Sequence, residues 1–135
     1  ASAQVLRMRS PVIDNDIAVA TDRMQTLLER IEARSKAIDP GIFNTGVAHL
    51  GDGNLHYAGF PSASDPALHR AIQRAVEEEV IALGGSFSAE HGIGLSKKPA
   101  MALHKDKAAL GVMRGIKTAL DPNNIMNPGK LLPDA

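Results

Sequence analysis

The sequence of 135 residues lacks cysteine and tryptophan and has no net charge. The absence of cysteine excludes disulfides, thiolate metal sites and thiol catalysis. Fifteen basic residues balance fifteen acidic ones, so no net charge attracts the chain to nucleic acid or to an anionic membrane. Aromatic residues make up only 3% of the chain, which argues weakly against a nucleic-acid-binding or flavin-binding surface. No apolar run could span a bilayer and no signal peptide is visible, so we expect one cytoplasmic globular domain over residues 1–135.

The spacing of apolar residues predicts an alternation of strands and helices. Strands are predicted at residues 14–20, 42–50, 55–60 and 86–89, and helices at about 21–38, 66–83 and 106–120. Thr21 is predicted to cap the first helix and Asp65 the second, which ends at Gly84. The order of the first six elements is typical of a ferredoxin-like βαββαβ fold of the α+β class, with both helices on one face of an antiparallel sheet. An irregular tail follows the last helix.

Two histidines stand on either side of a tight turn in the stretch GVAHLGDGNLH, residues 46–56. Asp52-Gly53 between two apolar runs predicts a two-residue type I′ turn. With the turn there, His49 pairs directly with His56. Paired residues point to the same face, with Cβ atoms about 4.5–5.5 Å apart, so the two imidazoles could bind one metal ion. A cross-strand pair of solvated histidines is the alternative, and spacing alone does not decide between the two.

The stretch SAEHGIG supplies two further candidates, Glu90 and His91. A carboxylate with two histidines makes a three-ligand site with an open position, which is typical of catalytic metals. Neighbours in a regular strand point to opposite faces, so both can serve one site only if the backbone leaves strand geometry, which Gly92 permits. In a ferredoxin-like sheet, Glu90 reaches the histidines only from a loop over the sheet or from a rearranged sheet. A strand end with both side chains solvated is the alternative.

Other polar residues give weaker signals. Asn54 is an ordinary turn residue by default, but its amide could contact a ligand beside the histidines. His69 and His104 are predicted to lie on the surface. The glycine-rich stretches lack the strand–loop–helix context of a dinucleotide fingerprint.

Three motifs occur in an order that resembles a known family: HLGDGNLH, then SAEHGIG, then DPNNIMNPGKLL. Together they are similar to the C-terminal domain of FAD-linked oxidases of the glycolate oxidase D-subunit, D-lactate and D-2-hydroxyglutarate dehydrogenase type, in the vanillyl-alcohol oxidase superfamily. The resemblance covers about residues 14–132. It implies that an N-terminal FAD-binding domain, absent from this sequence, belongs to the same polypeptide and is capped by this domain. The fragment alone is then expected to be inactive.

The resemblance also implies roles for individual residues. His49, His56 and Glu90 would bind a divalent metal, either zinc, manganese or iron. His91 would be the general base that takes the hydroxyl proton while a D-2-hydroxy acid of the lactate, glycolate or 2-hydroxyglutarate class is oxidised to the 2-oxo acid.

The resemblance concerns three more positions, two that would contact the cofactor and one that departs from the family pattern. Asn127 and Lys130 of the NPGK tail would return toward the flavin domain and contact the cofactor. Ala58 stands where members of the family often carry Asn on the same strand face as the second histidine, which leaves the identity of the substrate open.

Two other classes of function would use the same residues. One is a non-catalytic metal-binding module of ferredoxin-like shape, and the other is a small metal-dependent hydrolase that holds a water on the metal. The expected partners are a small 2-hydroxy acid and the FAD domain, with no nucleic acid. Self-association through the apolar surface that a missing domain would expose is a further expectation.

Overall fold

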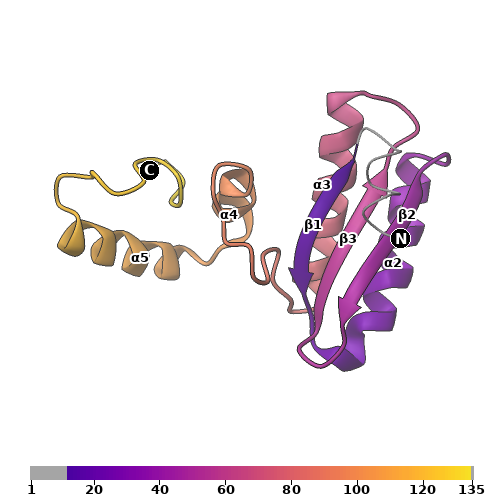
Figure 1. Cartoon of the computed structure of the whole chain (residues 1–135), viewed down its shortest axis with the longest axis horizontal. Coiled ribbons are helices and arrows are strands. Elements are labelled where there is room, and N and C mark those ends of the chain that lie inside the picture. Colours follow the sequence, from indigo (N-terminus) through magenta and orange to yellow (C-terminus); the bar gives the residue numbers. More distant parts are fainter. Residues whose placement is uncertain (1–11, 135) are drawn as a thin grey trace. The chain divides into compact units, whose positions relative to one another are not determined.

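The computed structural model describes residues 12–134, which form two compact units, residues 12–90 and 91–134. The first unit contains an antiparallel sheet in the order β1-β3-β2, built from β1 (Ile13–Ala18), β2 (Phe43–His49) and β3 (Asn54–Phe60). Helices α2 (Met24–Ile38) and α3 (Pro66–Ala82) cover one face of this sheet, as Figure 1 shows. The predicted α+β class and ferredoxin-like arrangement are confirmed.

The predicted fourth strand, residues 86–89, is wrong in its extent. The structure reduces it to a single bridge between Ala18 and Ser86 on the free side of β1. The Ser86 hydroxyl donates to the carbonyl oxygen of Ser88 at 2.8 Å and accepts from its amide at 3.3 Å. Such local side-chain bonds divert backbone groups from a strand ladder, so the segment leaves regular strand geometry after one bridge.

The helix boundaries agree with the sequence except at the first N-terminus. Thr21 does not cap α2 but begins a short 3₁₀ turn, η1 (Thr21–Arg23), in which the Arg23 amide donates to the carbonyl oxygen of Ala20 at 2.8 Å. Such a turn is a common entrance to an α-helix and satisfies backbone groups without a side-chain cap. At α3 the prediction is confirmed: Asp65 accepts from the Ala67 amide at 2.8 Å, and Gly84 ends the helix at a φ of +72°.

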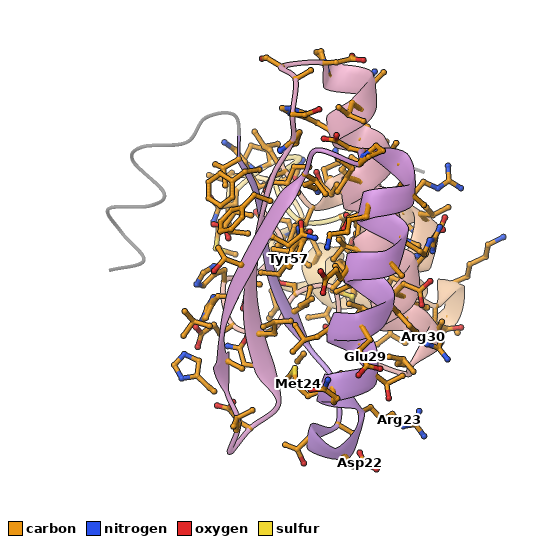
Figure 2. The ribbon with its side chains drawn as sticks, turned by 90° about the vertical axis from the view of Figure 1, so that its right-hand side faces the viewer. Asp22, Arg23, Met24, Glu29, Arg30 and Tyr57 are labelled. Carbon is orange, nitrogen blue, oxygen red and sulfur yellow. The ribbon has the colours of Figure 1, made fainter. Side chains whose placement is uncertain are left out.

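The core of the first unit lies between the sheet and the two helices. Figure 2 shows Met24 and Tyr57 in the layer between the sheet and α2. The apolar side chains that are almost wholly buried include Ile17, Leu27, Ile31, Leu55, Ile72, Val76 and Val80. Because Ile17 and Leu55 point into this core, the alternate residues of β1 and β3 point to the opposite face of the sheet.

A chain of partly buried hydrogen bonds links the sheet to α2. The Tyr57 hydroxyl donates to Asn44 Oδ1 at 2.8 Å, and Asn44 Nδ2 donates to Ser35 Oγ at 2.8 Å. Burial raises the pKa of Tyr57 from its usual 10.0 to about 12. The folded state therefore favours the neutral phenol over the phenolate. The free energy of unfolding should fall as the pH rises from 10.0 to about 12.

Replacing Tyr57 with phenylalanine tests this chain of bonds. The change leaves Asn44 Oδ1 without its donor, so we expect the free energy of unfolding to fall by about 1–2 kcal/mol. Urea unfolding followed by circular dichroism measures the loss. The variant should also lose less stability than the original chain between neutral and strongly alkaline pH. Equal stability and an equal alkaline loss in the two proteins would contradict the role of the hydroxyl.

The second unit contains α4 (Lys98–His104) and α5 (Lys107–Leu120) followed by an irregular tail. Helix α5 is predicted from the sequence, whereas α4 is not. The N-terminus of α5 is capped by Asp106, which accepts from the Ala109 amide at 2.9 Å. Of the predicted apolar side of α5, Leu110 is buried whereas Ile116 is 56% exposed. Within the described part of the chain, no helix has the length and apolar character required to cross a bilayer.

Candidate metal and substrate site

The hairpin between β2 and β3 has a different register from the predicted one. His49 pairs with Asn54, and His56 pairs with Val47, so the connecting loop has four residues, 50–53, and the predicted two-residue turn is wrong. The amides of Asp52 and Gly53 both donate to the carbonyl oxygen of His49, at 3.2 and 3.1 Å. In this loop Gly53 has a positive φ of 73° and Asp52 does not, whereas a type I′ turn needs two such residues in succession.

The two histidines nevertheless lie side by side. Relative to the prediction, the partner of His49 moves two positions along β3, from His56 to Asn54. Side chains alternate between faces with a period of two, so a shift of two positions keeps both imidazoles on the same face as diagonal neighbours. Their ring centroids are 5.4 Å apart, and the ring planes meet at 84°.

A cluster of potential metal ligands forms around His56. Asp16 on β1 pairs directly with His56 on β3, and Glu90 follows the bridge segment. His56 Nε2 lies 3.1 Å from Glu90 Oε1, and one ligand atom from each of these three residues lies within 4.8 Å of the others. The Asp16 side chain is buried, while the side chains of His56 and Glu90 are 27% and 56% exposed.

Asp16 positions the segment that carries Glu90. The Ala89 amide donates to the carbonyl oxygen of Asp16 at 3.0 Å, and the Glu90 amide donates to its carboxylate Oδ2 at 2.9 Å. These two bonds hold the chain against β1 just after it leaves strand geometry. Glu90 therefore reaches the histidine face from a loop beside β1, which is one of the two routes that the sequence analysis allows.

Asp16 is not among the site residues predicted from the sequence, although the sequence holds a signal for it. In the stretch IDNDIA, Asp14 and Asp16 alternate with residues that include Ile13 and Ile17 of the core. In a ferredoxin-like sheet the first strand lies beside the third, so an acidic residue on the outer face of the first strand lies near the histidine strand.

The other predicted site residues are placed as follows. His49 is exposed beside His56 and lies outside the group of ligand atoms described above. Asn54 is 5% exposed, and its Oδ1 has no hydrogen-bond partner among the described residues. His91 follows Glu90 directly in the chain and begins the second unit. Their roles stay predictions.

The predicted cofactor contacts lie in the tail of the second unit. Asn127 has a φ of +47°, and its carbonyl oxygen accepts from the Lys130 amide at 3.2 Å in a turn. Both residues are exposed. A contact with flavin stays a prediction for each of them.

The donor set around His56 fits a divalent metal. Zinc binds His nitrogen and carboxylate oxygen at about 2.0–2.2 Å, so two ligand atoms of one ion lie about 3–4 Å apart. The 3.1 Å separation of His56 Nε2 and Glu90 Oε1 agrees with this spacing. Mixed imidazole and carboxylate ligands suit zinc, manganese and iron.

Comparison with known proteins defines the class. Residues 1–131 match the family model described as FAD linked oxidases, C-terminal domain. The chain therefore belongs to this family.

Several relatives indicate which enzymes contain such a domain. The chain is 39% identical over 119 residues to mitochondrial D-2-hydroxyglutarate dehydrogenase of Bos taurus, covering 87% of this chain and 21% of that protein. It is 32% identical to a probable mitochondrial D-lactate dehydrogenase of Danio rerio, covering 97% of this chain and 27% of that protein. It is 30% identical to the glycolate oxidase subunit GlcD of Bacillus subtilis, covering 97% and 28%. The chain thus spans less than a third of the length of these relatives.

Proposed function

We propose that the chain is the metal- and substrate-binding domain of an FAD-dependent oxidoreductase that oxidises a D-2-hydroxy acid to the 2-oxo acid. The FAD would be bound mainly by another domain of the same polypeptide. The main support is the convergence of Asp16, His56 and Glu90, three residues far apart in the sequence, on one face of the sheet. The relatives, whose names describe D-2-hydroxyglutarate dehydrogenase, D-lactate dehydrogenase and a glycolate oxidase subunit, support the reaction type.

In this proposal, His49, His56 and Glu90 hold the metal and Asp16 keeps Glu90 in place. A bound divalent metal would act as a Lewis acid toward the oxygens of the substrate. The position of Glu90 at the edge of the site, with its side chain 56% exposed, leaves room for a ligand beside it.

The remaining chemistry falls to His91 and to the cofactor. His91 would take the proton of the substrate hydroxyl on a ring nitrogen, because imidazole is a competent general base near neutral pH. The chemistry that bound FAD would supply is the acceptance of the α-hydrogen of the substrate together with two electrons. Asn54, Asn127 and Lys130 keep their predicted substrate and cofactor contacts in this proposal, and cytoplasmic localisation likewise stays a prediction.

The test uses the intact polypeptide that contains this chain, purified with its flavin. We expect D-2-hydroxy acids, and not their L enantiomers, to bleach the absorbance of oxidised flavin under anaerobic conditions. Removal of metal with a chelator should abolish bleaching, and zinc, manganese or iron should restore it. Replacing His91 with glutamine should slow bleaching by about 100-fold or more while FAD stays bound.

The matched control is His69→Gln, which replaces a histidine on α3 whose Nε2 lies 3.2 Å from the carbonyl oxygen of Ala63. This variant should retain full activity. If no D-2-hydroxy acid bleaches the flavin of the intact protein, the proposed function is wrong. If His91→Gln behaves like His69→Gln, the assignment of His91 as the base is wrong.

A further inference from the structure

The sheet face that carries the candidate site is arranged in rows across the three strands. The first row is Asp16, His56 and Val47, from β1 to β2. The next row along the strands is Asp14, Ala58 and Thr45, and beyond it Phe60 pairs with Phe43, their ring centroids 5.8 Å apart. The helices α2 and α3 cover the other face of this sheet (Figure 1), so a ligand at His56 would lie on the face that carries these rows.

The second row, formed by Asp14, Ala58 and Thr45, contains a carboxylate and no cation. Asp14 is exposed and pairs directly with Ala58, whose small side chain is 8% exposed. None of the three strands contains Lys or Arg in its described residues. Next to His56 on the β2 side lies Val47, which is 52% exposed and presents an apolar surface.

The spacing of the rows relates this surface to the length of a substrate. Successive residues on one face of a strand are separated by about 7 Å along the strand. We take as part of the proposal a substrate whose hydroxyl and first carboxylate lie at the His56 row and whose remaining carbons extend over the row of Asp14 and Ala58. A second carboxylate on a five-carbon chain would reach the neighbourhood of Asp14.

We propose that this face selects 2-hydroxy monocarboxylates with a short uncharged side chain and disfavours dicarboxylates such as 2-hydroxyglutarate. The inference rests on the proposed function. A second carboxylate would lose hydration and meet the like charge of Asp14, with no cation of the three strands to compensate it. A methyl or ethyl group carries no charge and would instead lie beside the exposed apolar side chain of Val47. The preference that we propose for this chain thus differs from the substrate in the name of the bovine relative, D-2-hydroxyglutarate dehydrogenase.

The experiment measures kcat/KM of the intact, metal-loaded polypeptide for D-2-hydroxybutyrate and D-2-hydroxyglutarate. We expect the monocarboxylate to be preferred by about tenfold or more. Asp14→Lys should raise the ratio of kcat/KM for the dicarboxylate to that for the monocarboxylate by about tenfold or more, because it converts repulsion into attraction at the second carboxylate.

Asp22→Lys is the matched control, because it makes the same change of charge at an exposed aspartate in the η1 turn (Figure 2). It should leave the ratio of the two kcat/KM values unchanged. Titration of the flavin spectrum with 2-oxobutyrate and 2-oxoglutarate gives an independent measure of binding, and Asp14→Lys should strengthen binding of the second compound alone.

The outcomes separate this inference from the function on which it rests. If the original protein prefers the dicarboxylate, or if Asp14→Lys and Asp22→Lys change the ratio equally, the inference is wrong and the proposed oxidation of 2-hydroxy acids stands. If neither compound bleaches the flavin and no other D-2-hydroxy acid does, the proposed function is wrong and the inference is wrong with it.

Discussion

Replacing His56 with alanine is expected to remove metal binding from this domain and to abolish flavin reduction in the intact protein. His56 is the central member of the cluster, with Asp16 beside it in the sheet and Glu90 Oε1 3.1 Å from its Nε2. The change removes a nitrogen ligand and leaves two carboxylates that repel each other near the vacated position. We expect metal affinity to fall by about 100-fold or more, since the loss of an outer-shell partner alone typically costs 10–100-fold. Competition with a chromophoric chelator measures the affinity.

Parallel variants identify the third ligand. We predict a comparable loss for His49→Ala, because the His49 ring lies beside the His56 ring at a centroid distance of 5.4 Å. Asp16→Asn keeps the shape of the side chain and an acceptor for the Glu90 amide, so it should weaken binding less. A larger loss for Asp16→Asn than for His49→Ala would assign the third position to Asp16. His69→Ala is the control, and a loss of metal there or its retention in His56→Ala would contradict the site.

Local patterns in the sequence are sufficient to predict most of the first unit. The alternation in β1 and β3 and the helical spacing in α2 and α3 predict these elements because each must bury one face in the same core. The Asp65 cap and the Gly84 stop add start and end signals that depend on neighbouring residues alone. Elements whose form is decided by local hydrogen bonds or by one buried face are therefore predictable here.

The features that the sequence analysis misses depend on contacts between distant segments. The hairpin register is set partly by Gly53, whose carbonyl oxygen accepts from the Val19 amide at 3.0 Å at the end of β1. Asp16 joins the site only because β1 pairs with β3, and Glu90 only because Asp16 holds its backbone amide. The Asp52-Gly53 pair indicates a local turn, but it does not indicate these contacts with distant segments. The two histidines still lie on the same face of the sheet, because a register shift of two residues does not change the face to which a side chain points.

Replacing Gly53 with alanine is expected to be the most damaging single-methyl change in the hairpin. Gly53 has a φ of +73°, and a Cβ built there lies 2.1 Å from the carbonyl oxygen of Val19. Backbone must move to relieve this contact, because neither atom belongs to a flexible side chain. A left-handed φ costs a residue with a Cβ about 1–2 kcal/mol, and overpacking adds about 1–3 kcal/mol, so we expect a loss of about 2–5 kcal/mol in the free energy of unfolding.

Gly51→Ala provides a matched comparison two residues away in the same loop. A Cβ at Gly51 has no atom within 4 Å, and its φ lies outside the left-handed region, so its effect should stay within about 0.5 kcal/mol. Urea unfolding of both variants followed by circular dichroism gives the difference directly. Movement of the loop away from β1 would also separate Asp16 from His56, so Gly53→Ala should bind metal less tightly than Gly51→Ala. Equal stability of the two variants would mean that the contact between Gly53 and Val19 does not fix the register of the histidine strands.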